Sequence, residues 1–361
     1  MTRWVDEGFQ REDISVSLKD GKEKEKSPLS LYTVDDIITV APKMKEIKER
    51  IKRVAETDST VMIYGATGTG KELVSQSIHS ASRRRSHKFV SQNCAAIPET
   101  LLESILFGTT KGSYTGAENK PGLFEIANGG TLFLDEINSM ELGMQAKLLK
   151  VTEEKKVTRI GGVNPIPVDV KIISATNELP EDCVRQKRLR EDLFYRLSVV
   201  RLDLPPLTDR PGDIQRLIHY FIDYYNRKMN RNVMDVSEEV EQLFLRYDWP
   251  GNVREMKNVI EGAFNLISSR VIQLQDLPEY ILRSNERQQA GLSSGEMLNC
   301  GLSLTEMVSN YEKKLIEEAL NNSRNVTEAA DKLHITKQAL SYKLAKYELN
   351  FKKASRKGSA Q

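Results

Sequence analysis

The stretch GATGTGKE, residues 65–72, decides the fold of this chain. It follows the apolar, β-branched run TVMIY, residues 60–64, and precedes a helical pattern that starts at Leu73, so it joins a strand to a helix. In the spacing G-x-x-x-x-G-K, glycines let backbone N–H groups curl around an anion at a helix N-terminus, and the lysine reaches the outer phosphates. The sequence therefore predicts a phosphate-binding loop. Its residues are Gly65, Ala66, Thr67, Gly68, Thr69, Gly70, Lys71 and Glu72.

Glu72 departs from the general pattern, which has Ser or Thr there to hold Mg²⁺. Metal coordination must then rely on another carboxylate. Asp135 and Glu136 follow the apolar run TLFL, residues 131–134. We expect Asp135 to hold Mg²⁺ and Glu136 to polarise the water that attacks the γ-phosphate.

Apolar strands alternate with helical stretches from residue 40 to about residue 204. Asn93, Asp135 and Asn177 each stand at the C-terminal end of a strand. This arrangement is typical of an α/β fold with a doubly wound parallel sheet that binds its ligand along the strand ends. The predicted strands are residues 60–64, 89–91, 131–134, 170–174 and 199–204.

Composition excludes several classes of protein. The chain is 39% hydrophobic and 29% charged, has no long apolar run and shows no signal peptide, so we expect a cytoplasmic protein without a membrane span. The three cysteines, Cys94, Cys183 and Cys300, are too far apart to indicate a zinc site or a disulfide framework. From residue 321 to the end, nine Lys or Arg stand against three Asp or Glu, which favours a nucleic-acid contact there.

Shifts in composition and periodicity divide the chain. The first segment mixes charged and small residues and is too short for a sensor domain. Helical periodicity follows the α/β region, and a polar, glycine-containing stretch separates it from the basic end. The expected parts are a flexible lead (1–30), an α/β ATPase core (31–210), a helical lid (211–282), a linker (283–302), a helix-turn-helix domain (303–350) and a basic tail (351–361).

Residues 93–140, NCAAIPETLLESILFGTTKGSYTGAENKPGLFEIANGGTLFLDEINSM, resemble the AAA+ domain of bacterial enhancer-binding proteins, the activators of sigma-54 RNA polymerase. The resemblance runs from about Ile37 to Leu349 and accounts for Glu72, since Glu commonly follows the loop lysine in that family. It implies ATP and Mg²⁺ as cofactors and a ring oligomer, with a hexamer as the expected ring. The family's sigma-54 contact loop normally reads GAFTGA. The matching residues are Gly112, Ser113, Tyr114, Thr115, Gly116 and Ala117, so Tyr keeps the aromatic ring of Phe.

The same resemblance implies further site residues. Asn93 matches the switch residue that senses the γ-phosphate through Glu136, and Asn177 matches the first sensor. Arg190 and Arg196 resemble the arginine fingers that are presented to a neighbouring subunit. Arg254, in the motif GNVRE, resembles the second sensor of the lid, and Asn252 of that motif is expected to cap a new helix.

The basic C-terminal region reads as helix, turn, helix from residue 326 to residue 347 and resembles the Fis-type DNA-binding domain. His334 replaces the usual glycine of the turn, and His tolerates the left-handed conformation. An apolar stripe before it, Leu304 to Ala319, is interpreted as both core and dimer face. Thr336 would cap the second helix, Lys337 and Gln338 would face base edges, and Ser341, Lys343 and Lys346 would meet phosphate.

Three functions compete at this point. The preferred one is a sigma-54-dependent activator that binds upstream DNA and uses ATP hydrolysis to remodel sigma-54 RNA polymerase holoenzyme into the open complex. The second is an ATP-switched DNA-binding regulator or repressor without sigma-54 remodelling, which the altered loop keeps open. The third is an ATP-driven DNA translocase. The central motifs also look similar to regulators of arginine or other amino-acid catabolism.

Overall fold

The computed structural model describes residues 31–113 and 118–283 and, in its C-terminal part, residues 309, 312–313, 315–316, 319–320, 323, 325–347 and 349. The chain divides into two compact units, Met1–Asn285 and Glu286–Gln361, and each is described by itself. The predicted lead, nearly all of the predicted linker, the predicted tail and the loop residues Tyr114, Thr115, Gly116 and Ala117 lie outside the described residues.

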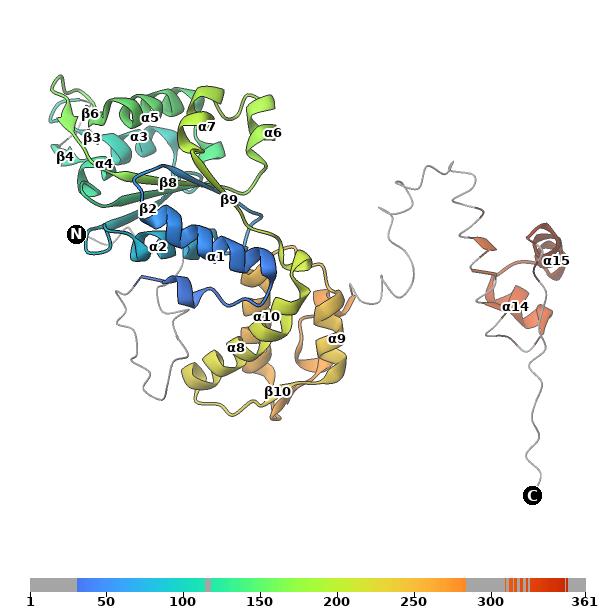
Figure 1. The fold of residues 1–361 in the computed structure, drawn as a ribbon. Helices are drawn as coiled ribbons and strands as arrows, with labels where there is room; N and C mark the ends of the chain where they lie inside the picture. The colour runs from blue at the N-terminus through green and yellow to red at the C-terminus, as the bar shows by residue number, and fades with distance from the viewer. Residues whose placement is uncertain are drawn as a thin grey trace. The chain divides into compact units, whose positions relative to one another are not determined.

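A five-stranded sheet with the order β2-β5-β8-β1-β9 forms the centre of the first unit (Figure 1). All of its neighbouring strands are parallel, which confirms the predicted α/β fold class. Because parallel strands end at one edge, the residues that follow them meet there. The strands are β1 (Val61–Tyr64), β2 (Phe89–Asn93), β5 (Thr131–Asp135), β8 (Lys171–Thr176) and β9 (Val200–Asp203).

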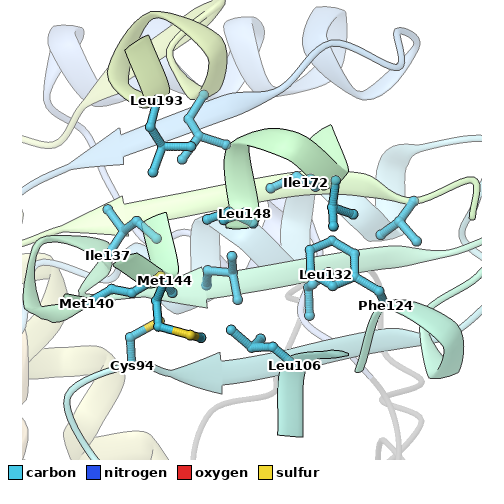
Figure 2. Packing of buried hydrophobic residues seen from close by; sticks show 14 of the residues in the cluster. Cys94, Leu106, Phe124, Leu132, Ile137, Met140, Met144, Leu148, Ile172 and Leu193 are labelled. Carbon is cyan, nitrogen blue, oxygen red and sulfur yellow. The ribbon is translucent and has the colours of Figure 1, made fainter. Parts of the chain in front are cut away.

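Both faces of the sheet are buried under helices. Alternate residues of each strand point to opposite faces, so neighbouring residues pack into different clusters. Leu132 of β5 packs into one hydrophobic cluster, and its neighbour Phe133 packs into another. Figure 1 shows α1 and α2 on one face and α3, α5 and α7 on the other. Figure 2 shows the cluster on the latter face, to which Leu132, Leu148 and Leu193 all belong. The helices of this layer are α1 (Pro42–Ala55), α2 (Lys71–Ala81), α3 (Glu99–Phe107), α4 (Leu123–Ile126), α5 (Leu142–Glu154), α6 (Pro180–Arg185) and α7 (Glu191–Leu197).

Two short antiparallel ribbons extend from this layer, β3 (Gly108–Thr109) with β4 (Lys120–Pro121) and β6 (Lys156–Val157) with β7 (Ile166–Pro167). The N–H of Thr110 donates to the carbonyl of Ile160 at 3.0 Å and so ties the two ribbons together. The first residues of the predicted sigma-54 loop, Gly112 and Ser113, follow directly; Gly112 has a φ of +85°. The loop therefore begins on a fixed base.

The lid has a hydrophobic cluster of its own, in which Trp249 and Phe244 are fully buried. The expectation that Asn252 caps α10 is wrong, because Gly251 is the N-cap and Asn252 is the first helical residue. Glu255 nevertheless accepts the N–H of Gly251 at 2.8 Å, one residue further along than in a capping box. The lid consists of α8 (Pro211–Met229), α9 (Glu238–Arg246) and α10 (Asn252–Leu266), with the two-stranded pair β10 (Asp235–Val236) and β11 (Val271–Ile272).

The second unit contains α14 (Val326–Lys332) and α15 (Lys337–Lys346). Thr336 caps α15 as predicted, since its hydroxyl accepts the N–H of Ala339 at 3.2 Å, and His334 occupies the left-handed conformation with a φ of +54°. The preceding helical residues bury Ile316 and Leu320 in the domain core, whereas Leu315 of the predicted stripe is exposed.

Candidate active site

The phosphate loop joins β1 to α2 and depends on backbone conformations that favour glycine. Gly68 and Gly70 have φ values of +79° and +103°, and Gly70 is the N-cap of α2. A Cβ at Gly70 would meet nothing within 4 Å, so this turn is open toward the helix N-terminus. In the described parts of the chain, the N–H groups of Thr67, Gly68 and Gly70 donate to no acceptor. These donors fit the phosphates of a nucleotide.

The side chain of Lys71 packs against the phosphate loop. This side chain is buried, and Nζ donates to the carbonyls of Gly65 at 2.8 Å and Ala66 at 3.4 Å. Burial lowers the pKa of Lys71, while the nearby carboxylates of Asp135 and Glu136 act in the opposite direction. The ammonium group therefore bonds to the loop and lies within electrostatic reach of both carboxylates.

Asp135 and Glu136 leave the C-terminal end of β5. The Asp135 carboxylate accepts the N–H of Glu136 at 2.9 Å, and Glu136 has a φ of +53°. A left-handed glutamate is uncommon and occurs chiefly where the surroundings impose it, as at catalytic sites. Mg²⁺ is usually bound by one or two carboxylates together with substrate phosphates, so this pair beside the phosphate loop fits the ion.

The two predicted asparagines lie at the same edge of the sheet. Asn93 pairs in register with Asp135, and its amide oxygen accepts the N–H of Ala95 at 2.8 Å; in the described residues it has no hydrogen bond to Glu136. The amide of Asn138 donates to the Asn177 side chain at 3.4 Å. The predicted sensing roles stay predictions.

Glu72 lies in the first turn of α2, where its carboxylate accepts from the Gln76 amide at 3.2 Å. This contact holds its side chain along the helix.

Cys94 and Cys183 are buried, and burial raises the pKa of the Cys94 thiol to about 12, so it stays protonated.

The lid approaches the loop more closely than the sequence suggests. A Cβ at Gly68 would lie 2.1 Å from the carbonyl oxygen of Gly251 and 3.1 Å from the Cβ of Arg254, the predicted second sensor. One further lid residue, Arg210, was missed, and Asn252 was expected only as a helix cap. Arg210 is buried and donates to the carbonyl of Thr69 at 3.3 Å, and the Asn252 amide donates to the carbonyl of Thr67 at 3.0 Å. Their partners are more than 100 residues away, so no local pattern marks them.

The two predicted arginine fingers lie on or beside α7, and their partners are on α5 and α7. Arg190 forms a bidentate ion pair with Asp192, at 3.0 and 2.7 Å, and Arg196 donates to the carbonyl of Thr152 at 2.7 Å. Arg190 and Asp192 also line an open hollow of about 500 Å³. Within the described residues, neither arginine bonds to the phosphate loop.

In the second unit, the predicted DNA-contacting residues are displayed unequally. Lys337, Gln338, Ser341 and Lys346 are exposed on α15. Lys343 is only half-exposed and forms an ion pair with Glu312, which also accepts from the Tyr347 hydroxyl. The ion pair with Glu312 competes with the phosphate contact that the sequence predicts for Lys343.

Three family models match the chain. A sigma-54 interaction domain matches residues 37–203, an AAA+ ATPase lid domain matches residues 208–294, and the Fis family of bacterial regulatory proteins matches residues 308–347. The transcriptional activator RocR of Bacillus subtilis is 45% identical over 318 residues, which are 88% of this chain and 69% of RocR. The chain belongs to the family of sigma-54-dependent transcriptional activators.

Two further proteins are similar to this chain in sequence or in structure. The regulatory protein AtoC of Escherichia coli is 42% identical over 87% of this chain and 68% of its own length. The crystal structure of NtrX from Brucella abortus in complex with ADP aligns with a TM-score of 0.65 and 30% identity, over 87% of this chain and 70% of NtrX. NtrX is also known in complex with ATP, at a TM-score of 0.63. The chain is therefore an AAA+ ATPase with a Fis-type helix-turn-helix domain.

None of the helices in the described ranges combines the length and the apolar character that a membrane span needs.

Proposed function

We propose that this sigma-54-dependent transcriptional activator binds upstream DNA through α15 and uses ATP hydrolysis to remodel sigma-54 RNA polymerase into the open complex. The observation that carries the proposal is the pair of carboxylates beside the phosphate loop, Asp135 and the left-handed Glu136, in a chain that also matches a sigma-54 interaction domain. The carboxylate pair supports ATP hydrolysis, and the match to a sigma-54 interaction domain supports sigma-54 RNA polymerase as the partner on which hydrolysis acts.

The residues divide the work as follows. The loop N–H groups and Lys71 hold the nucleotide phosphates, and Asp135 holds Mg²⁺, which neutralises charge on the phosphates when it is bound. Glu136 accepts a proton from the attacking water. Asn93 and Asn177 stand next to the carboxylates in the sheet and report the state of the γ-phosphate to the elements that follow them.

Arg190 and Arg196 complete the site of a neighbouring copy of the chain. This is supported by the place of both arginines at α7, where within the described residues neither bonds to the phosphate loop of its own chain. An arginine directed at the transferring phosphoryl group can raise turnover by about 10³- to 10⁵-fold. Hydrolysis then requires a ring, and a hexamer is the expected assembly, with dimers formed through the C-terminal domain.

The loop Gly112–Ala117 contacts sigma-54. It starts at Gly112 and Ser113, directly after the ribbon of β3 that Thr110 ties to Ile160. A change at the nucleotide edge of the sheet can reach this base through α3, which precedes β3 in the chain.

The test is open-complex formation by sigma-54 RNA polymerase on a supercoiled promoter, with this protein and ATP, beside a Thr115→Ala control. Opening that needs both ATP hydrolysis and Thr115 is the expected result. The absence of opening, with ATPase activity and DNA binding intact, would contradict the proposal.

That negative result would favour the second candidate, an ATP-switched DNA-binding regulator or repressor. Ser113 and Tyr114, which replace Ala and Phe of the family's loop, are the observation in its favour. Restoring the family's residues with Ser113→Ala and Tyr114→Phe should then create opening activity where the natural chain has none.

A further inference from the structure

The lid bonds to three successive carbonyl groups of the phosphate loop. The Asn252 amide donates to Thr67, the N–H of Val253 donates to Gly68 at 3.1 Å, and Arg210 donates to Thr69. The first and third distances are 3.0 and 3.3 Å. No other segment of the described chain bonds to these three carbonyls from outside the loop.

These contacts have a consequence for the opposite side of the loop. In a trans peptide unit the C=O of one residue and the N–H of the next point in opposite directions. Because the carbonyls of Thr67 and Thr69 face the lid, the N–H groups of Gly68 and Gly70 face away from it. These two N–H groups donate to no described residue and so are available to phosphate.

The two side chains involved are themselves held firmly. Asn252 is 2% exposed, has a φ of +51°, and its amide oxygen accepts the N–H of Leu207 at 2.7 Å. Arg210 is 4% exposed, lies 3.8 Å from the buried Asp213 and has an Nε without a hydrogen-bond partner. A buried guanidinium with an unsatisfied N–H lowers stability. The position of this group against the loop points to a role other than packing.

We propose that Asn252 and Arg210 are positioning residues of the ATPase, which hold the loop carbonyls toward the lid and thereby set the loop N–H groups for the nucleotide phosphates. Rotation of the lid then changes nucleotide affinity through the loop N–H groups, in addition to any effect of Arg254 on the same lid. The proposal rests on the ATPase activity and not on sigma-54 remodelling.

The test uses Asn252→Gly with Asn230→Gly as the matched control. Both asparagines occupy the left-handed conformation in the lid, with φ values of +51° and +49°, so glycine fits either backbone and only the side chain is lost. Asn230 is exposed at the C-terminal end of α8. Affinities for ADP and AMP are measured by competition with a fluorescent ADP analogue, together with the thermal midpoint.

Asn252→Gly should weaken ADP binding about 5- to 10-fold, as the loss of the hydrogen bond to the Thr67 carbonyl predicts. AMP binding should fall less than about twofold, because the loop holds mainly the phosphates beyond the first. Asn230→Gly should change neither affinity. A folded Asn252→Gly protein whose ADP affinity is unchanged, or whose ADP and AMP affinities fall together, would overturn the proposal.

Arg210→Lys provides the second variant. It keeps a positive charge beside Asp213 but removes the planar donor that reaches Thr69. The same selective loss of ADP affinity is expected. If Asn252→Gly does not fold, an unchanged ratio of ADP to AMP affinity in Arg210→Lys would by itself refute the proposed role.

Discussion

The lid side of the nucleotide site and the α7 side use arginine in opposite ways. Arg210 of the lid is 4% exposed and bonds to the phosphate loop of its own chain. The Arg190 side chain is 39% exposed and bonds to Asp192, its neighbour beside an open hollow. One arginine is thus buried against the loop within a single chain, whereas the other is partly exposed and paired with Asp192. On the proposed function, this difference corresponds to nucleotide binding by the monomer and hydrolysis by the assembly.

The largest expected effect is a loss of ATP turnover without a loss of ADP affinity, on substitution of Arg190 or Arg196. Arg190→Ala or Arg196→Ala should lower ATP turnover about 10³-fold, because the transferring phosphoryl group loses its cationic partner. ADP affinity should stay within about twofold, since neither side chain contacts the phosphate loop. Steady-state hydrolysis and ADP titration measure the two quantities.

Arg185→Ala is the matched control for the arginine variants. Arg185 is also exposed and paired with an aspartate, Asp182, but it lies on α6. Equal losses of turnover in Arg185→Ala and Arg190→Ala would show that general surface charge, rather than an arginine finger, is responsible.

The next effect concerns the part of the site that one chain supplies. Glu136→Gln should bind ATP normally but lower turnover about 10²- to 10⁴-fold, because the amide cannot accept the proton of the attacking water. Glu141→Gln, at the exposed N-cap of α5, should have no effect. Near-normal turnover of Glu136→Gln would remove Glu136 from the role of general base.

A change in the second unit should leave both sides of the ATP site intact. Lys337→Ala, on the exposed start of α15, should weaken specific DNA binding by about 1–3 kcal/mol and relax the choice of base. Lys332→Ala on α14 is the control and should have a smaller effect. Identical footprints for Lys337→Ala and the natural chain would assign base reading to other residues.

The smallest effect is a dependence on pH. Burial lowers the pKa of Lys71 in the free protein, whereas bound phosphates favour its charged form. Binding then takes up a proton once the pH exceeds this lowered pKa, so ADP affinity should fall as pH rises, by no more than about tenfold per pH unit. Arg190→Ala should keep the same profile, because arginine does not titrate there. A profile that is flat up to the ordinary lysine range would contradict this role of Lys71.

The sequence predicted those parts of the site that depend on local pattern. The glycine spacing and the apolar runs placed the loop and the strand ends, because burial on both faces of a parallel sheet makes each strand visible as a run. It missed Arg210 and misread Asn252. Their bonds join residues 141 and 185 positions apart, which only the docking of the lid brings together.

In the C-terminal domain, too, the sequence predicted local features but not tertiary contacts. The cap at Thr336 and the left-handed His334 follow from local chemistry and were predicted. The buried face of the preceding helix was not, because Ile316 and Leu320, rather than Leu315, fill the domain core. In the same way, the pairing of Lys343 with Glu312 depends on tertiary packing that no periodicity reveals.

The most direct test of the division between binding and hydrolysis is a mixing experiment with two inactive variants, Glu136→Gln and Arg190→Ala. Each lacks a different half of the composite site, so the interface at which Glu136 of one copy meets Arg190 of another carries an intact pair of residues only in the mixture. We predict that mixtures regain ATPase activity with a maximum near equal proportions. Mixtures as inactive as the separate variants at every ratio would contradict a site that is shared between chains.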